Sequence, residues 1–504
     1  MEFNIPSTLI ALLSFLLFLL TFRKSRRISK FANSYPHIPG PKTLPLIGNL
    51  HLMLRATVPH HMFRDLAAKH GPLMHLQLGE IHFVVISSVD FANQVVRTHD
   101  LNFANRPRGL VAETLSYNYT AIVFTPYGDH WRQLRKICTL ELLSARRVQS
   151  FRHIREEESM HMCEWIASRA GSPANLSEKL FLTSYDIITR AVVGARTAEC
   201  GTMTSIIEEA TQLGAGFMLA DLYPSVKWLP LITGARFKIR RMHRKLDKLF
   251  SSIVEQHRSA GDAAGVFEDL VDVLLKIQRD GTELPLTIDN IKAVVLDMFI
   301  AGTDTSSITI EWAMSELIRN PSKLNKAQEE VRKVFDDKGY IDEDKFDELK
   351  YLKLIIKETL RLHPPLPFLV PRINAERCEI NGYEIPAKTT VIVNAWALGR
   401  DPKYWKDAEK FIPERFEESS HDFKGNNLEY LPFGAGRRMC PGMSFGLANI
   451  ELPLAMLLYH FDWKMPKGIQ NKDLDMAEAF GVTVRKKHHL HLIPTVKRPL
   501  RAAA

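Results

Sequence analysis

The most specific segment of this 504-residue chain reads Leu431-Pro432-Phe433-Gly434-Ala435-Gly436-Arg437-Arg438-Met439-Cys440-Pro441-Gly442. Its glycines and prolines predict a loop. We expect Pro441 to begin an apolar helix that extends to about His460, because proline is favoured at the first position of a helix. Cys440 would then lie at or next to the N-cap, where the helix dipole and free N–H groups stabilise a thiolate. Such a thiolate is a soft, electron-rich ligand for iron.

The remaining cysteines are expected to be small buried hydrophobic residues. Five cysteines are too few for a disulfide scaffold, and an odd number without paired spacing argues against a zinc module. Reduced thiols of this kind fit a protein that faces the cytosol. The four residues are Cys138, Cys163, Cys200 and Cys378.

The longest predicted helix runs from Thr287 to Asn320 and is ended by Pro321. Its middle reads Ala301-Gly302-Thr303-Asp304-Thr305-Ser306-Ser307, which is a run of weak helix formers inside an apolar helix. Local conflicts of this kind concentrate at functional sites. The alternative is a patch of hydroxyls that bond back to their own helix and bend it.

The chain from about residue 57 onward has mainly helical patterning, with four short runs that resemble strands. No internal repeat is present, and no further Pro/Gly/Ser-rich linker divides this part. We therefore expect one domain, larger than usual, which a buried cofactor would help to organise. The strand-like runs are Leu73–Leu78, His82–Ser87, Cys378–Ile385 and Thr389–Asn394.

The N-terminus contains an almost wholly apolar stretch from Ile5 to Phe22. Its length is near the lower limit for a membrane-spanning helix, since each residue adds about 1.5 Å and the hydrocarbon core is about 30 Å thick. Glu2 precedes the stretch and five basic residues follow it, which is the reverse of the order in a cleaved signal peptide. We expect an uncleaved signal-anchor helix at 1–22, a basic and proline-rich linker at 23–50, and the domain at 51–504, which the positive-inside rule places in the cytosol.

The net charge of +9 is concentrated at the two ends of the chain. Residues 23–30 carry five positive charges and residues 485–501 carry six, with no acidic residue in either segment. These eleven charges exceed the total, so the rest of the chain sums to −2. A nearly neutral body excludes nucleic acid as a partner recognised through charge.

The chain resembles the cytochrome P450 superfamily over essentially its whole length. The five fixed positions of that family's haem-binding signature are present as Phe433, Gly436, Arg438, Cys440 and Gly442. Three further motifs are similar to Glu-x-x-Arg, Pro-Glu-Arg-Phe and Trp-x-x-x-Arg: Glu358–Arg361, Pro413–Phe416 and Trp131–Arg135. The resemblance implies a mainly α fold with small β-sheets, in which 51–504 is a single large catalytic haem domain behind the transmembrane anchor.

The resemblance also assigns roles around haem b. Cys440 would be the axial ligand of the iron, and Phe433 and Gly436 of the same signature would be cofactor-binding residues. Guanidinium groups bind carboxylates in a bidentate manner, which suits contacts to the haem propionates. The implied propionate contacts are Trp131, Arg135, Arg372 and Arg438. A buried cluster that braces the haem loop is implied for Glu358, Arg361 and Arg415.

Asp304 and Thr305 match the acid–alcohol pair that delivers protons in the family, and Gly302 would leave room for dioxygen. Relatives that isomerise or dehydrate hydroperoxides without O₂ typically depart from this pair. The resemblance therefore implies a monooxygenase that uses O₂.

Electrons must come from a partner, because no Gly-rich dinucleotide fingerprint follows a strand in this chain. By resemblance the donor is NADPH–cytochrome P450 reductase in the endoplasmic reticulum membrane, an acidic partner. A basic docking face is one interpretation of five residues, and an ordinary solvated face is the other. They are Arg132, Lys136, Arg146, Arg147 and Arg437.

The segments that line the substrate pocket in similar proteins are uncharged here, which suits a small apolar substrate because a buried unpaired charge is costly. The expected lining is Phe124, Ile300, Ala301, Leu366, Phe368, Val370, Phe480 and Val482. The alternative is that these are ordinary core residues. A polar contact to the substrate from Arg108, Glu113 or Asn118 also stays open.

More closely, the chain is similar to plant family 71 enzymes and particularly to the D subfamily. The likeness rests on His60-His61-Met62-Phe63-Arg64-Asp65-Leu66 and Asp221-Leu222-Tyr223-Pro224. Many members hydroxylate terpenoids, so we expect hydroxylation of a terpenoid. The alternatives are a phenylpropanoid or flavonoid hydroxylase and, more remotely, a haem sensor or electron carrier without enzymatic activity.

Overall fold

The computed structural model describes residues 38–54, 58–196, 200–214, 217–260 and 268–500. The predicted anchor at 1–22 lies outside the described residues, as does the linker up to residue 37. Within the described part, α15 (Ile288–Arg319) is the only helix long and apolar enough to cross a membrane, and most of it is buried inside the protein.

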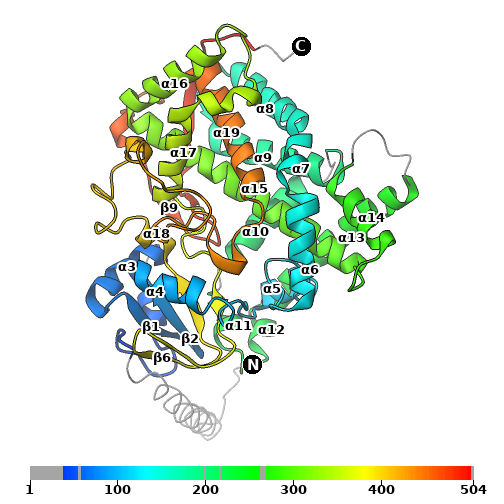
Figure 1. Cartoon of the computed structure of the whole chain (residues 1–504), viewed down its shortest axis with the longest axis vertical. Helices are drawn as coiled ribbons and strands as arrows, with labels where there is room; N and C mark the ends of the chain where they lie inside the picture. Colours follow the sequence, from blue (N-terminus) through cyan, green and yellow to red (C-terminus); the bar gives the residue numbers. More distant parts are fainter. Residues whose placement is uncertain (1–37, 55–57, 197–199, 215–216, 261–267, 501–504) are drawn as a thin grey trace, which may run out of the picture.

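α15 is the central helix of a large helical body (Figure 1). Thr287 caps it in a reciprocal capping box, in which the Thr287 side chain accepts from Asn290 N–H and the Asn290 side chain accepts from Thr287 N–H. The helix ends at Arg319, and Pro321 begins the next one. The predicted long helix is therefore confirmed to within one residue at each end.

Three helices pack closely against α15: α9 (Leu176–Val193), α17 (Lys350–Leu362) and α19 (Met443–His460). A further helix, α8 (Arg152–Ala167), packs against α9 and α19. The apolar faces of these helices form two large cores, one along the N-terminal half of α15 (residues 291–299) and one along its C-terminal half (residues 310–318). The middle of α15, residues 301–307, lies between the two cores.

The remaining helices complete the body and its periphery. The α-helices are α2 (Leu50–Met53), α3 (Pro59–His70), α4 (Val89–Asn93), α5 (Leu110–Leu115), α6 (Asp129–Ile137), α7 (Ala145–Ser150), α10 (Cys200–Leu213), α11 (Leu219–Leu222), α12 (Leu229–Ile232), α13 (Ala235–Ala260), α14 (Leu270–Asp280), α16 (Pro321–Phe335) and α18 (Ala395–Leu398). The π- and 3₁₀-helical segments are η1 (Gln94–Thr98), η2 (Cys138–Leu142), η4 (Glu343–Glu348), η5 (Pro413–Phe416), η6 (Gly436–Arg438) and η7 (Asn471–Asp473).

The largest sheet has four strands in the order β1-β2-β7-β4 and lies at one end of the molecule (Figure 1). β1 pairs antiparallel with β2, and β2 pairs parallel with β7. The other sheets are β3-β11-β8, β5-β6 and β9-β10. Their bounds are β1 (Leu73–Leu78), β2 (Ile81–Ile86), β3 (Ala174–Asn175), β4 (Arg372–Ile373), β5 (Cys378–Ile380), β6 (Tyr383–Ile385), β7 (Thr390–Val393), β8 (Phe461–Lys464), β9 (Glu478–Ala479), β10 (Arg485–Lys486) and β11 (His491–Val496).

All four strand-like runs of the sequence form strands, and the mainly helical fold with small sheets is confirmed. The run Cys378–Ile385 is a hairpin whose turn residues Asn381 and Gly382 both have positive φ, 46° and 85°. Asn and Gly are the residues that such tight hairpin turns favour.

The described end of the proline-rich segment is fastened to this sheet. His75 N–H on β1 donates to the Pro39 carbonyl at 2.8 Å, and the Asn49 amide donates to the carbonyls of Pro41 and Lys42. The boundary at residue 50 between linker and domain stays a prediction.

Candidate functional site

Cys440 lies in the loop before α19, but that helix begins later than expected. Its first residue is Met443 and its N-cap is Gly442, so the prediction that Pro441 begins the helix and that Cys440 is next to the N-cap is wrong. A short turn separates the two, and the Cys440 amide donates to the Phe433 carbonyl at 3.0 Å. Burial raises the pKa of the Cys440 thiol, while a hydrogen bond from the Gly442 N–H and the charge of Arg135 oppose that rise.

Cys440 lies deep inside the protein, yet its side chain is not covered by neighbouring atoms. Its accessible surface therefore faces the interior of the protein. The middle of α15 also has accessible residues within a buried part of the protein. Ala301 is exposed and Gly302 and Thr305 are half-buried, whereas Thr303 and Asp304 are buried. One side of the central helix therefore borders an interior space.

Three predicted arginines and one that the sequence did not single out form a cationic group beside the Cys440 loop. Arg438 donates to the carbonyls of Ala104 at 2.7 Å and Thr125 at 2.6 Å, and it lies over the Trp131 ring at 4.4 Å. Arg135 donates to the Met439 carbonyl.

Arg372 is engaged differently, in a buried ion pair with Asp100 at 2.7 Å. Arg106 donates to the carbonyls of Val370 at 2.6 Å and Pro371 at 3.0 Å. A lone arginine in a loop has no spacing signal, which is why sequence reasoning missed Arg106.

The charges of this group are not balanced. Burial lowers the pKa of Arg438 to about 9, with help from Arg372 and Arg135, and burial with Arg438 and Arg372 lowers the pKa of Arg106. Among the described residues, Asp100 is the one carboxylate that pairs with the group. The excess positive charge beside an inward-facing thiol fits a cofactor with two carboxylates, so the residues present fit a haem.

Glu358, Arg361 and Arg415 lie together as the motifs implied. Both Glu358 oxygens accept from Arg361 at 2.8 Å, and Arg415 Nε lies 3.0 Å from Glu358 Oε1. Arg361 also donates to the Gly399 and Ala408 carbonyls. The cluster thus fastens α17 to the chain that approaches the Cys440 loop.

Asp304 and Thr305 do not contact each other through their side chains. The Thr305 hydroxyl donates to the Ala301 carbonyl at 2.6 Å. The Asp304 carboxylate is fully buried and accepts from the Thr483 hydroxyl, and it forms an ion pair with Arg485. Burial raises the pKa of Asp304, and Arg485 and Thr483 oppose that rise.

Comparison with known proteins decides the family. The family model described as Cytochrome P450 matches residues 38–493. The chain belongs to the cytochrome P450 family. A zebra fish cytochrome P450 solved with abiraterone has the same fold, with a TM-score of 0.75 and 24% identity over 88% of this chain and 100% of that one.

Plant cytochromes P450 are more similar. Salviol synthase of Salvia pomifera is 51% identical over 99% of both chains, and premnaspirodiene oxygenase of Hyoscyamus muticus is 51% identical over 98% of this chain and 99% of that one. Desmethyl-deoxy-podophyllotoxin synthase of Sinopodophyllum hexandrum is 51% identical over 97% of both. Relatives at about 50% identity also include cytochrome P450 71D10 of Glycine max, so the predicted likeness to the 71D group is confirmed.

Membership fixes the enzyme class and the cofactor. This chain is a haem-thiolate monooxygenase that uses O₂ and electrons derived from NADPH. The individual site residues are assigned by motif and geometry, and their roles remain predictions.

The expected pocket residues of this cytochrome P450 are placed as follows. Phe368 is buried against Phe63, and its ring lies 5.9 Å from that of Phe480. Ala301 is exposed on α15. The others are half-buried, and no described contact joins them into one lining: Phe124, Ile300, Leu366, Val370 and Val482.

Asp297 is a further residue that sequence reasoning missed. It is half-buried on α15 and accepts from Val123 N–H at 3.0 Å, which fastens the loop before Phe124 to the central helix. Burial raises the pKa of Asp297 to about 7. An aspartate within an apolar run was visible in the sequence and could have been the signal.

The suggested docking face of the cytochrome P450 is only partly free. Arg132 pairs with Asp129, and Arg147 pairs with Glu268 at 3.4 Å. Arg437 is exposed but lies 3.6 Å from Asp100. Lys136 and Arg146 are exposed on the surface and accessible to a partner.

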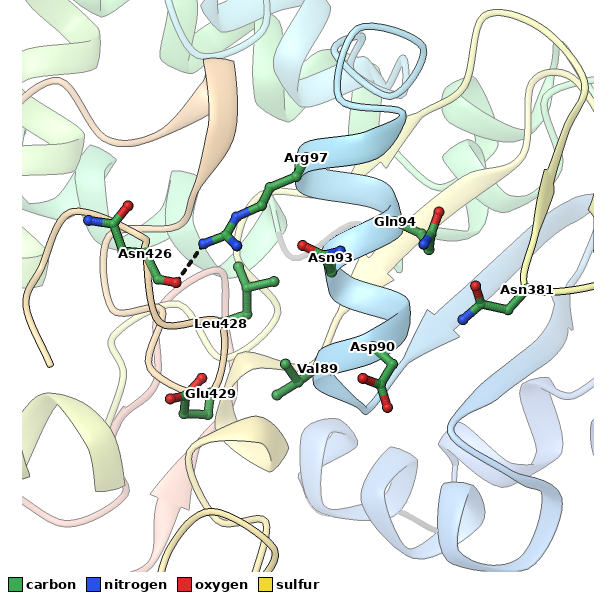
Figure 2. A pocket seen from close by; sticks show the side chains of 9 residues that line it. All are labelled: Val89, Asp90, Asn93, Gln94, Arg97, Asn381, Asn426, Leu428 and Glu429. Carbon is green, nitrogen blue, oxygen red and sulfur yellow. Dashed lines mark hydrogen bonds between the residues drawn. The ribbon is translucent and has the colours of Figure 1, made fainter.

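A separate surface pocket of about 470 Å³ lies between the α4–η1 helical run and the chain around Asn426 (Figure 2). Arg97 donates to the Asn426 carbonyl across it. Its lining consists mostly of amides and charged groups, which does not match the expected apolar pocket. The lining residues are Val89, Asp90, Asn93, Gln94, Arg97, Asn381, Asn426, Leu428 and Glu429.

Proposed function

We propose that this cytochrome P450 hydroxylates an apolar terpenoid with one oxygen atom of O₂. The observation that carries the proposal is the uncharged character of all eight expected pocket residues, which favours a hydrocarbon-like ligand because a buried unpaired charge is costly. The names of two relatives, premnaspirodiene oxygenase and salviol synthase, support it.

Bound haem supplies the activation of dioxygen. In our proposal Cys440 holds the iron, and Arg106, Arg135, Arg372, Arg438 and Trp131 hold the propionates. Phe433 and Gly436 shape the loop, and the Glu358–Arg361–Arg415 cluster keeps that loop in place. The unbalanced guanidinium group supports this assignment, because two carboxylates would neutralise it.

Asp304 and Thr305 deliver protons to the reacting dioxygen in this proposal. Thr305 is half-buried at the interior space and can donate there, while Asp304 has both oxygens engaged on the other side of α15. Gly302 has a packing reason of its own, since a side chain there would collide with Ile188 of α9 at 2.4 Å. Its role in leaving space for dioxygen stays a prediction.

The proposed location is the endoplasmic reticulum membrane, with a single N-terminal span and a cytosolic domain. Exposed large apolar side chains gather on α11, α12 and the start of α13, and such patches mark membrane or partner contacts. They are Leu219, Trp228, Leu231, Ile232 and Phe237. We assign this patch to the membrane and the basic residues Lys136, Arg146 and Arg437 to NADPH–cytochrome P450 reductase.

A phenylpropanoid-type substrate is the second candidate. A relative at 51% identity is named desmethyl-deoxy-podophyllotoxin synthase, and the loop from Arg108 to Phe124 carries polar side chains. In the structure Arg108 lies over the Tyr119 ring at 5.6 Å, so it already has a partner.

The deciding experiment is turnover by the full chain with a plant reductase in microsomes. NADPH is supplied with a pool of terpenoid hydrocarbons and alcohols or with a pool of phenylpropanoids and flavonoids, and Cys440→Ala is the control. Products heavier by one oxygen from the terpenoid pool alone support the proposal. Products from the phenolic pool alone favour the second candidate, and no NADPH-dependent product from either pool contradicts the proposed reaction.

A further inference from the structure

The turn from Ala479 to Arg485 carries two kinds of residue side by side. Phe480 and Val482 are expected substrate contacts, and Thr483 and Arg485 reach the carboxylate of Asp304 on α15. The turn is thus placed between the expected pocket and the acid of the central helix.

Each oxygen of Asp304 is engaged by this turn. Oδ2 accepts from the Thr483 hydroxyl, and Oδ1 lies 2.5 Å from Arg485 Nη2. Asp304 is 0% exposed and Thr483 is 6% exposed, so water does not compete for the hydrogen bond between them. The contact at Oδ1 is an ion pair without hydrogen-bond geometry, so the hydrogen bond from Thr483 is the directional contact that orients the carboxylate.

The turn itself is fixed by its backbone. Val482 N–H donates to the Thr211 carbonyl at 3.0 Å, and Val484 N–H donates to the Pro365 carbonyl at 3.0 Å. The Trp312 ring on α15 donates to the Val484 carbonyl at 3.2 Å. The backbone on both sides of Thr483 is therefore held, which makes its hydroxyl a preorganised donor.

We propose that Thr483 is a positioning residue for Asp304, so that one turn both contacts the substrate and orients the acid. This inference rests on the proposed role of Asp304 in proton delivery. Besides Arg485, the charged groups around Asp304 are Glu208 on α10 and Glu311 on α15, and Lys486 on β10 acts on Glu311. Arg485 also pairs with Glu208 at 3.0 Å, so its charge is shared, and Thr483 is the donor that serves Asp304 alone.

The test compares Thr483→Val, which removes the hydroxyl and keeps the shape, with Thr483→Ser, which keeps the hydroxyl. Thr211→Val is the matched control, because Thr211 is equally buried beside the same turn but its hydroxyl bonds only to its own helix. With a pooled terpenoid that the wild type converts, the share of NADPH electrons recovered in product should fall about threefold or more in Thr483→Val. Thr483→Ser and Thr211→Val should stay near the wild type.

A second readout needs no substrate. Protonated Asp304 has a carboxyl C=O infrared band, which is identified because the Asp304→Asn variant lacks it. The intensity of this band as the pH is changed reports the protonation of Asp304. Loss of a hydrogen bond to the charged form raises the pKa of a carboxyl group, so this band should persist to higher pH in Thr483→Val but not in Thr211→Val. Thr483→Ala replaces Thr483→Val if the valine chain does not bind haem.

Two failures are distinguishable. If Asp304→Asn recovers the same share of NADPH electrons in product as the wild type, that is, if it stays fully coupled, the proposed proton delivery by Asp304 is wrong. If Asp304→Asn is uncoupled while Thr483→Val matches Thr211→Val in coupling and in the infrared titration, the role of Thr483 alone is overturned.

Discussion

Glu358 and Arg361 lie one turn apart on α17 and pair with each other in the interior, with Arg361 Nε 2.8 Å from Glu358 Oε2 and neither side chain accessible. A buried pair of this kind is weak evidence of net stabilisation, because both charges lose their hydration. Removing one partner is costly, however, since it leaves the other charge buried and unpaired.

We therefore expect Arg361→Lys to lose most of its haem incorporation. Lysine cannot reproduce the bonds that the guanidinium makes to Glu358 and to backbone carbonyls. Lysine keeps the positive charge, so the expected loss of stability is that of the missing charge-assisted hydrogen bonds, about 1.5–3 kcal/mol. The measurement is the carbon monoxide difference spectrum per purified chain.

The matched control for that change is Arg498→Lys, whose pair with Asp336 is partly exposed. Exposed pairs contribute about 0–1 kcal/mol, so this variant should keep the spectrum of the wild type. Equal spectra in both lysine variants would contradict the bracing role.

Two glycines of the haem loop provide a second prediction. Gly434 and Gly436 both have left-handed φ, 72° and 69°. Alanine in that conformation costs about 1–2 kcal/mol at either position. At Gly436 alone the new Cβ would also meet the Val96 carbonyl at 2.4 Å, whereas Gly434 has open space.

Gly436→Ala should therefore destabilise the holoenzyme clearly more than Gly434→Ala, by at least about 2 kcal/mol on the scale of overpacking. Urea unfolding monitored by haem absorbance gives the two values. Equal destabilisation would mean that the close approach to Val96 is relieved at little cost.

A third prediction concerns pH. Burial raises the pKa of Asp297 to about 7, from an ordinary value near 3.8. The folded state then holds the proton longer than the unfolded state, so the stability from this site is greatest below about pH 4 and falls as the pH rises to 7. The shift corresponds to up to about 4 kcal/mol.

Asp297→Asn keeps an acceptor for Val123 N–H but cannot ionise. The part of the loss of stability between about pH 4 and 7 that Asp297 causes should therefore be absent from this variant. The difference in unfolding free energy between wild type and variant is measured from about pH 4 to 8. This difference separates the effect of Asp297 from that of Glu451, whose pKa burial also raises to about 7. A difference that does not change with pH would contradict the assignment.

The sequence predicted most of the fold because its strongest signals are local. The apolar run and Pro321 define the ends of α15. The strand-like run Cys378–Ile385 was also recognised, but the sequence analysis did not predict that Asn381-Gly382 divides it into a hairpin. The cysteine loop was recognised from spacing, but the start of α19 was placed two residues early because proline was given more weight than the glycine that follows it.

Long-range contacts could not be predicted in the same way. Asp304 and Thr305 are adjacent in sequence, yet the helix turns their side chains apart and Asp304 meets Thr483 and Arg485, about 180 residues away. Arg106 likewise could be recognised as part of the cationic group only once Arg438 and Arg372 were seen beside it.

The apolar patch gives a fourth prediction. Trp228 is 59% exposed, and in vesicles of brominated lipid its fluorescence should be quenched in the full-length protein. The quenched component should be absent from Trp228→Phe and present in Trp165→Phe, whose ring is covered by Arg169 at 3.7 Å. Equal quenching in both variants would show that the patch does not enter the membrane.

The last prediction concerns Thr305. Thr305→Ala should bind haem normally but consume NADPH largely without forming product, because the half-buried hydroxyl at the interior space is lost. Thr309→Ala is the control, since its hydroxyl lies one turn on and donates to the Thr305 carbonyl at 2.8 Å, away from that space. The measurement is product formed per NADPH consumed, with hydrogen peroxide as the side product. Tight coupling in Thr305→Ala would show that the Thr305 hydroxyl is not needed for proton delivery. Proton delivery would then be assigned to another group, such as Asp304 without Thr305.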